Sequence, residues 1–399
     1  MSSAGWRSDE QSSADQIRSD GSGTRAGRRR GLRAAVVTSA VVTSAVVAAG
    51  VVAVAGCASA SAVATSALAA STSGSASWHI VKRVPSGSSG GFTEVTAVGK
   101  NGGWAFNAGS VPTAWERNRS TWTQVPFPGL SDEVVVAAGG TSAADAWAFT
   151  SDFGKSRALH WNGRTWSVQH IFSREIGGAV VISRSDVWVF GELFLPGAEL
   201  GAWHYDGHTW SRVSSGHGLE GGSALSASDI WAFDGADVAH WNGATWSRTS
   251  VASLLPARQQ LNDPTLTGIY AESRHSVYAI ANGNLQDEGG PIVVLHWNGS
   301  AWSKVARGQF GFGILQQLSS DGHGGLWLPM PGFGGQKSYL VHYSNGHLTT
   351  AALPVAASSI GLDTVSIIPG GTGVLAAGET HARNAPGTDV VAVILQYKA

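Results

Sequence analysis

One seven-residue motif occurs four times in this chain and limits its fold more than any other feature. HWNGRTW stands at residues 160–166, and related copies occupy 204–210, 240–246 and 296–302. Asn-Gly and Asp-Gly pairs favour β-hairpin turns of type I′, in which both central residues need φ > 0. We therefore expect a type I′ hairpin at each copy, and the tryptophans at its ends should pack between neighbouring units. The expected central pairs are Asn162-Gly163, Asp206-Gly207, Asn242-Gly243 and Asn298-Gly299.

The motif belongs to a longer repeat that recurs seven times. A second pattern precedes it, and its copies begin with GWAF at 103, AWAF at 146, VWVF at 187, IWAF at 230, VYAI at 277, LWLP at 326 and VLAA at 374. Each copy resolves into four short strands separated by turn residues. A period of roughly 40–45 residues with four strands per unit is typical of a β-propeller blade. We therefore predict an all-β fold, a seven-bladed propeller over residues 77–399.

The two ends of this region predict how the ring closes. The seventh repeat supplies LDTVSII, GVLAAGE and VVAVILQYK and then reaches Ala399 without a fourth strand. The segment SWHIVKRVP at 77–85 resembles the fourth strands of the other repeats, such as TWSRVSS at 209–215. We therefore expect this N-terminal strand to complete the last blade. An open solenoid would have no use for it.

The first 76 residues show no pattern of a globular fold. Residues 1–33 are polar with a basic end, and 34–57 form an uncharged apolar run that ends in Cys57. A basic flank before an apolar run of about 20 residues is typical of an export signal or a membrane anchor. Residues 58–76 are rich in Ala, Ser and Thr, which predicts a flexible linker.

Two short motifs refine this interpretation. Val54-Ala55-Gly56-Cys57 resembles a bacterial lipobox, in which the cysteine is lipidated and becomes the new N-terminus, and Cys57 is the single cysteine of the chain. Arg29 and Arg30 resemble a twin-arginine export signal. The sequence thus predicts a lipoprotein on the outer side of the cytoplasmic membrane, or a secreted protein. The alternative is an uncleaved single-pass helix with its N-terminus inside the cell.

The repeat itself resembles a known group of proteins. SRSDVWVFG at 183–191 and SASDIWAF at 226–233 match the S-x-S-D-V-W-A-x-G pattern that precedes H-W-N-G-x-x-W-S in exported, tryptophan-rich actinobacterial propellers. That group is mostly of unassigned function, so the resemblance implies the fold and export only. HYDGHTW is loosely similar to the Asp-box of sialidase-type propellers. WD40, kelch and quinoprotein repeats are absent, and no cofactor is expected.

The repeated histidines invite a metal hypothesis, but their spacing argues against it. One histidine occupies the same place in five repeats: His160, His204, His240, His296 and His342. Equivalent positions in a propeller lie far apart around the ring, so these imidazoles cannot converge on one ion. We expect them to be structural and to bond a neighbouring strand or the hairpin.

Carboxylates and loops supply the candidate binding residues. Five acids lie at or just before an expected inner strand and could form a partial ring that holds Ca²⁺: Glu94, Glu133, Glu175, Glu220 and Asp363. Solvated loop acids are the alternative interpretation. The connections between second and third strands vary most, and variable loops on a rigid ring are common recognition sites. Their candidate contact residues are Phe153, Phe194, Leu195 and Phe333.

Composition and site chemistry narrow the function. The net charge of −1 and the lack of a basic cluster beyond Arg33 argue against nucleic acid as a partner. No three arginines and no close carboxylate pair can be assigned to the ring axis, so we expect a monomeric, non-enzymatic module that binds a protein or a glycan. The alternative is a hydrolase or lyase that acts on polysaccharide at the channel mouth. A scaffold for an envelope complex would share every feature of the binding module.

Overall fold

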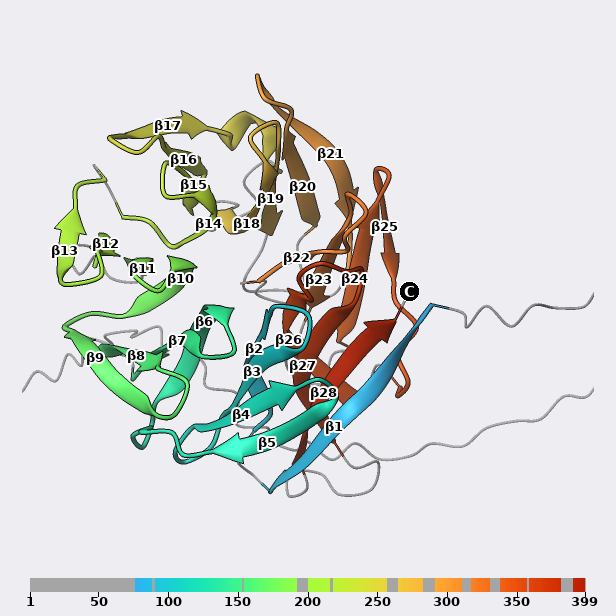
Figure 1. Cartoon of the computed structure of the whole chain (residues 1–399). Coiled ribbons are helices and arrows are strands. Elements are labelled where there is room, and N and C mark those ends of the chain that lie inside the picture. The colour runs from blue at the N-terminus through green and yellow to red at the C-terminus, as the bar shows by residue number, and fades with distance from the viewer. Residues whose placement is uncertain are drawn as a thin grey trace, which may run out of the picture. The chain divides into compact units, whose positions relative to one another are not determined.

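In the computed structural model, seven four-stranded antiparallel sheets form a β-propeller (Figure 1). The structure describes residues 76–87, 90–152, 154–191, 200–215, 218–256, 265–282, 291–310, 317–330, 338–356, 359–381 and 390–398. Blades one to six are β2–β5, β6–β9, β10–β13, β14–β17, β18–β21 and β22–β25, and blade seven contains β26–β28 with β1. Each inner strand contacts the inner strand of the next blade, and β26 contacts β2, so the ring is closed. The seven-bladed fold predicted from the repeats is confirmed.

The strands are short, as the repeat predicts. In chain order they are β1 (Ser77–Gly87), β2 (Phe92–Val98), β3 (Gly102–Asn107), β4 (Thr113–Asn118), β5 (Thr121–Val125), β6 (Val134–Ser142), β7 (Asp145–Ser151), β8 (Ser156–Trp161), β9 (Trp166–Phe172), β10 (Ile176–Ser183), β11 (Asp186–Gly191), β12 (Ala202–Tyr205), β13 (Trp210–Val213), β14 (Gly221–Ser226), β15 (Asp229–Asp234), β16 (Asp237–Trp241), β17 (Trp246–Ser250), β18 (Thr265–Ser273), β19 (Ser276–Asn282), β20 (Ile292–Trp297), β21 (Trp302–Gly308), β22 (Ser319–Ser320), β23 (Leu326–Met330), β24 (Tyr339–Ser344), β25 (His347–Thr350), β26 (Ile360–Ile367), β27 (Val374–His381) and β28 (Val390–Lys398). One 3₁₀ turn, η1 (Ala252–Leu254), follows β17. Within the described ranges, no helix is long and apolar enough to cross a membrane.

The N-terminal strand closes the ring as the sequence predicts. β1 pairs antiparallel with β28, with Ser77 opposite Lys398 and Gly87 opposite Val390. Figure 1 shows β1 (blue) beside β28 (red). The Trp78 ring, 4% exposed, packs edge-on against Trp327 of blade six at 5.2 Å between centroids. The closing strand therefore carries a repeat tryptophan into the interface between blades six and seven.

Tryptophan packing joins the blades. The aromatic residue in the middle of one second strand packs against the two aromatic residues that flank the hairpin turn of the next blade. Trp104 lies 4.9 Å from Trp161 and 4.8 Å from Trp166, between ring centroids. Trp188 meets the corresponding pair of blade four at 5.3 and 5.9 Å. The prediction that the hairpin tryptophans pack between units is confirmed, and each triad buries large apolar area at a blade interface.

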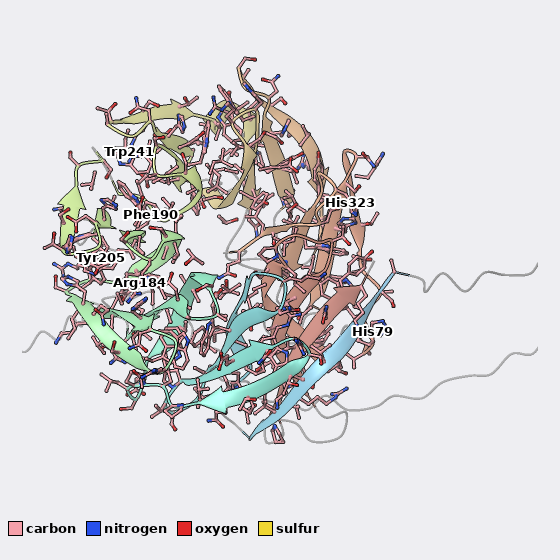
Figure 2. All side chains as sticks on the ribbon, viewed as in Figure 1. His79, Arg184, Phe190, Tyr205, Trp241 and His323 are labelled. Atoms are coloured by element: carbon pink, nitrogen blue, oxygen red, sulfur yellow. The ribbon has the colours of Figure 1, made fainter. Side chains whose placement is uncertain are left out.

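Burial follows strand position within a blade. The second strands are almost wholly buried on both faces, because neighbouring blades cover them on each side; all seven residues of β7 are buried. This explains their continuous apolar runs, which resemble those of strands covered on both faces. Figure 2 shows side chains filling the spaces between blades, among them Phe190 and Trp241, which belong to one cluster between blades three and four.

The inner strands approach one another closely and are linked by hydroxyl groups. A Cβ at Gly178 would lie 2.9 Å from the Gly221 Cα, so no side chain fits where blades three and four meet. Elsewhere a serine hydroxyl of one inner strand accepts a backbone N–H of the next. Ser366 accepts from Ala97 at 3.0 Å, and Ser319 accepts from Ile367 at 2.7 Å. These bonds connect strands that no sheet pairing joins.

The predicted type I′ turns are wrong at the four repeated motifs. Gly163 has φ +91°, but Asn162 is not among the described residues with positive φ. The Asn162 side-chain oxygen instead accepts the backbone N–H groups of Arg164 and Thr165, both at 3.0 Å. The asparagine thus caps the turn from outside, and the glycine is its first central residue. The same pattern of one positive φ recurs at Gly207, Gly243 and Gly299.

Candidate functional site

A cavity of about 410 Å³ lies at the centre of the ring. Its lining comes from the inner strands of blades one to five and seven, from Phe233 of β15, and from Gln317 and Leu318 just before β22. Many of these residues stand in the first halves of their strands. That end of each inner strand lies beside the connection between the second and third strands, because Phe92 pairs with Asn107 and Ile360 with Thr380. The cavity therefore lies toward the face that carries these connections.

Glu94 is the most buried acid of the cavity. It stands on β2 directly after a bulge, and its side chain is almost fully buried. The Gln317 side-chain amide donates to one Glu94 carboxylate oxygen, and the Thr364 hydroxyl donates to the Gln317 oxygen at 2.6 Å. Burial raises the pKa of Glu94 well above its usual range, and the hydrogen bond from Gln317 lowers it in part. Blades one, six and seven thus share one polar chain around this carboxyl.

Glu220 is the second acid of the cavity and comes from blade four. It directly precedes β14, and its backbone N–H donates to the Phe233 carbonyl at 2.9 Å. Burial raises the pKa of Glu220 to about 7, the backbone N–H of Gly235 lowers it in part, and the charge of Asp234 raises it further. Near neutral pH this carboxyl therefore exists in both protonation states.

The five predicted carboxylates do not form one ring. Only Glu94 and Glu220 line the cavity. Glu133 is buried in an ion pair with Arg157, whose Nε lies 2.6 Å from one Glu133 oxygen. Burial and Asp152 raise the pKa of Glu175, which does not line the cavity. Glu133, Glu175 and Glu220 each directly precede their inner strand, whereas Glu94 and Asp363 stand within theirs, so the place of an acid relative to its strand does not decide whether it lines the cavity.

Asp363 is the bulged residue of β26 and does not line the cavity either. Desolvation by the surrounding protein and the charge of Glu379 raise its pKa, although solvent reaches this side chain and weakens the effect. Among the described residues, no three His, Cys, Asp or Glu side chains lie close enough together to hold a metal ion. The proposed Ca²⁺ ring thus lacks the geometry that its five acids were expected to provide.

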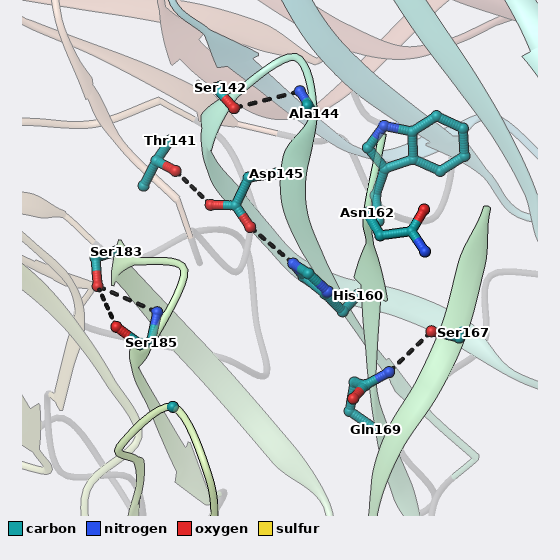
Figure 3. Close-up of polar contacts among 12 residues, drawn as sticks. Thr141, Ser142, Ala144, Asp145, His160, Asn162, Ser167, Gln169, Ser183 and Ser185 are labelled. Atoms are coloured by element: carbon teal, nitrogen blue, oxygen red, sulfur yellow. Dashed lines mark hydrogen bonds and ion pairs between the residues drawn. The ribbon is translucent and has the colours of Figure 1, made fainter. Parts of the chain in front are cut away.

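The repeated histidines are structural, as predicted. The His160 Nε2 lies 2.7 Å from an Asp145 oxygen, and the other Asp145 oxygen accepts the Thr141 hydroxyl (Figure 3). The His204 Nε2 lies 2.9 Å from an Asp186 oxygen, and the His240 Nε2 lies 2.9 Å from an Asp229 oxygen. Each imidazole also lies against the second-strand tryptophan of its blade, at 4.2–4.6 Å between ring centroids. The aspartate of the S-x-S-D pattern is therefore the hydrogen-bond partner of the histidine of the H-W-N-G pattern.

This arrangement varies in the later blades. In blade six Asp321 takes the role at 2.7 Å from His342, although it stands six residues before Trp327 rather than two. In blade five Ser276 replaces the aspartate and lies 3.1 Å from His296. All of these contacts lie at the end of the ring formed by the turns after first and third strands. The repeated motif is thus at the opposite end from the starts of the inner strands.

The predicted loop contacts lie outside the described residues. Phe153, Phe194, Leu195 and Phe333 all fall in segments that the structure does not describe. The export residues Arg29 and Arg30 and the lipidation residue Cys57 also lie outside the described part of the chain.

Sequence reasoning missed Gln317 and Thr364, which fix Glu94 in the cavity. Gln317 lies before the shortest inner strand, in a repeat whose pattern is degenerate, so no periodic signal marked it. Thr364 follows Asp363 in β26. The bulge at Asp363 determines that Thr364, rather than Asp363, contributes to the hydrogen-bonded chain around Glu94. The position of a bulge is not encoded in a pattern of period two.

Comparisons with known proteins agree on the fold. No family model matches the chain, and no curated protein matches it. YCF48 bound to a D1 peptide is 12% identical, with a TM-score of 0.51 over 81% of this chain and 97% of the other. YCF48 from Cyanidioschyzon merolae is also 12% identical, with a TM-score of 0.52 over 80% and 98%. U3-55K is 9% identical, with a TM-score of 0.53 over 79% and 98%. At these identities the similarity establishes the propeller fold alone.

Proposed function

We propose that this chain is a non-enzymatic binding module displayed outside the cytoplasmic membrane and held there through lipidated Cys57. It takes its ligand, a protein or a glycan, at the end of the ring where the central cavity lies. The observation that carries the proposal is this cavity: six inner strands converge on it, and its residues differ from blade to blade. A site that breaks the repeat on a rigid ring is where this fold is able to place recognition.

The structural neighbours favour a protein as the first ligand to test. One YCF48 structure contains a bound D1 peptide. This chain shares the fold with YCF48 at low identity, so the neighbour suggests the class of ligand and gives no residue of the site. A glycan remains the second class, and the experiment below separates the two.

One observation favours the rival hydrolase. Glu220, with a pKa of about 7, and the buried Glu94 share one cavity, and paired carboxyls with raised pKa values can act as general acids. Against this, the two acids stand on blades one and four, and no arginine is among the described residues that line the cavity. Release of reducing ends from envelope polysaccharide by the wild type, lost in Glu220→Gln, would establish the hydrolase and overturn the binding module.

The anchor is tested by intact mass and membrane fractionation of the native protein beside a Cys57→Ala variant. We expect the wild type to begin at a lipidated Cys57 and the variant to leave the membrane fraction. If both keep the full-length mass in the membrane, residues 34–57 form a permanent helix and lipidation is wrong.

The ligand class is tested with the mature protein immobilised and exposed to solubilised envelope. Samples are left intact, digested with protease, or treated with periodate to oxidise glycans. We expect binding that protease removes and periodate leaves in place. Loss with periodate alone identifies a glycan. Binding unchanged by Glu220→Gln and Gln317→Ala together would show that the cavity end of the ring is not the site.

A further inference from the structure

The central cavity is unbalanced in charge. Glu94 and Glu220 each contribute a carboxyl, and none of the described residues that line it is Lys, Arg or His. Arg248 of the same blade as Glu220 is engaged elsewhere: its guanidinium lies 3.1 Å from Asp234 and donates to the Gly218 carbonyl at 2.9 Å. Within the described ranges, neither cavity acid has a cationic partner.

Glu94 also has a carboxylate oxygen without a donor. The side chain is 3% exposed, and one oxygen accepts the Gln317 amide. The other oxygen accepts no hydrogen bond from a residue that the structure describes. Because Glu94 lines the cavity, this oxygen can accept a hydrogen bond from a donor delivered there.

The remaining lining is apolar or plain backbone. Phe233 contributes an aromatic ring, Val136 and Leu318 contribute aliphatic side chains, and Gly177 and Gly222 expose backbone. Aliphatic walls suit a hydrocarbon stem, and an aromatic face attracts a cation. A metal ion would need several oxygen ligands together, and among the described residues no group of three acids or histidines provides them.

We infer that the cavity binds a ligand that carries a primary ammonium group on a short aliphatic stem, such as a lysine side chain presented by a protein partner. The inference rests on the proposed function and names the chemistry that its site recognises. The ammonium donates to the free oxygen of Glu94 or to Glu220, and the stem contacts Phe233 and Leu318. A volume of about 410 Å³ is ample for such a group.

The test uses the intact mature protein and two small probes of the same length, 1,5-diaminopentane and 1,5-pentanediol. Binding is followed by saturation-transfer NMR and calorimetry. We expect the diamine to bind at least tenfold more tightly than the diol. Glu94→Gln and Glu220→Gln should each weaken diamine binding at least fivefold, because each replaces a carboxyl that can lose its proton and pair with the ammonium by a neutral amide of similar shape. Glu175→Gln is the matched control, since Glu175 lies outside the cavity, and it should bind like the wild type.

Folding is checked by thermal unfolding of every variant, and glutamine still accepts the bonds from Gln317 and Gly235. Equal binding of the diol, unchanged diamine affinity in both cavity variants, or an equal loss in Glu175→Gln would overturn the inference. The proposed function is tested separately. If the protein still captures an envelope ligand but does not bind the diamine, only the ammonium site is wrong. Diamine binding without any envelope ligand leaves a cation site on a propeller whose larger role is different.

Discussion

The two ends of the ring follow different rules. At the end formed by the turns after first and third strands, blades two, three and four repeat one contact set: an aspartate, a histidine and a tryptophan. At the other end, the aligned inner-strand positions vary more: they carry Glu94, Ala137 and Thr364 in blades one, two and seven and a glycine in blades three, four and five. The repeated end therefore builds the ring, and the unrepeated end is free to specialise. The predictions below test this division.

The largest effect is expected at the aromatic triads. Trp188→Ala removes a ring that is 2% exposed and that contacts Trp241, Trp246 and His204. We expect the free energy of unfolding to fall by about 3–5 kcal/mol, since the cavity left between two rigid blades cannot collapse. Chemical denaturation followed by fluorescence measures it. A loss below about 1 kcal/mol would mean that the triads do not hold the blades together.

The aspartate–histidine contact should rank next. Asp145→Ala leaves the buried His160 imidazole and the Thr141 hydroxyl without their shared acceptor, and we expect a cost of about 2–3 kcal/mol. Asp229→Ala should cost less, because His240 is about one-third exposed and water can replace the carboxylate. Denaturation of both variants and a double-mutant cycle with the histidines tests the order. Ligand binding at the cavity end should not change in either variant.

Glu220 should make stability depend on pH. Its pKa is about 7 in the folded chain and near the ordinary value of 4.5 when unfolded, so the folded state binds more protons between these values. Stability from this group is therefore greatest at low pH and falls as pH rises toward 7. Glu220→Gln should raise the stability at pH 8 by on the order of 1–2 kcal/mol and flatten this part of the profile. Thermal unfolding between pH 5 and 8 is the measurement, and an unchanged slope in the variant would contradict the assignment.

The smallest effect is expected at the turns. Gly163→Ala places a side chain at φ +91°, and its Cβ would lie 3.1 Å from the Ala144 Cβ, so we expect a loss of about 1 kcal/mol. Gly346→Ala is the companion variant, because it occupies the second position of a two-residue turn at φ +81°. Similar costs at both sites would show that the turn type does not matter to stability.

The sequence predicts the architecture well because the architecture is periodic. The seven repeats, the closing strand at residue 77 and the tryptophan interfaces all follow from spacing, and the structure confirms each. The prediction of a type I′ turn is wrong at Asn162, which precedes the two central residues and accepts the Arg164 backbone N–H with its side-chain oxygen. It would have held at Asn345-Gly346, where both residues have positive φ, in a repeat whose motif is degenerate.

The candidate site was only partly predictable, and for a related physical reason. Glu94 and Glu220 were named from their place near inner strands, and both line the cavity. Glu133 has the same place before its inner strand as Glu220, yet it forms a buried ion pair with Arg157 on the third strand of its own blade. Arg157 lies 24 residues after Glu133 on another strand of the blade, and Gln317 lies 223 residues after Glu94 in another blade. Spacing along one strand carries no information about them.

The closing strand also determines how the ring responds to mechanical force. Ser77 and Lys398 lie at the repeated end of the ring, and Gly87 lies at the cavity end. A pull between the chain before Ser77 and a ligand held at the cavity end would run along the length of β1. Such a load shears the ladder between β1 and β28 as a whole, rather than peeling its hydrogen bonds apart one at a time. The strand that completes the fold would therefore resist such a pull through the whole ladder between Ser77–Gly87 and Val390–Lys398.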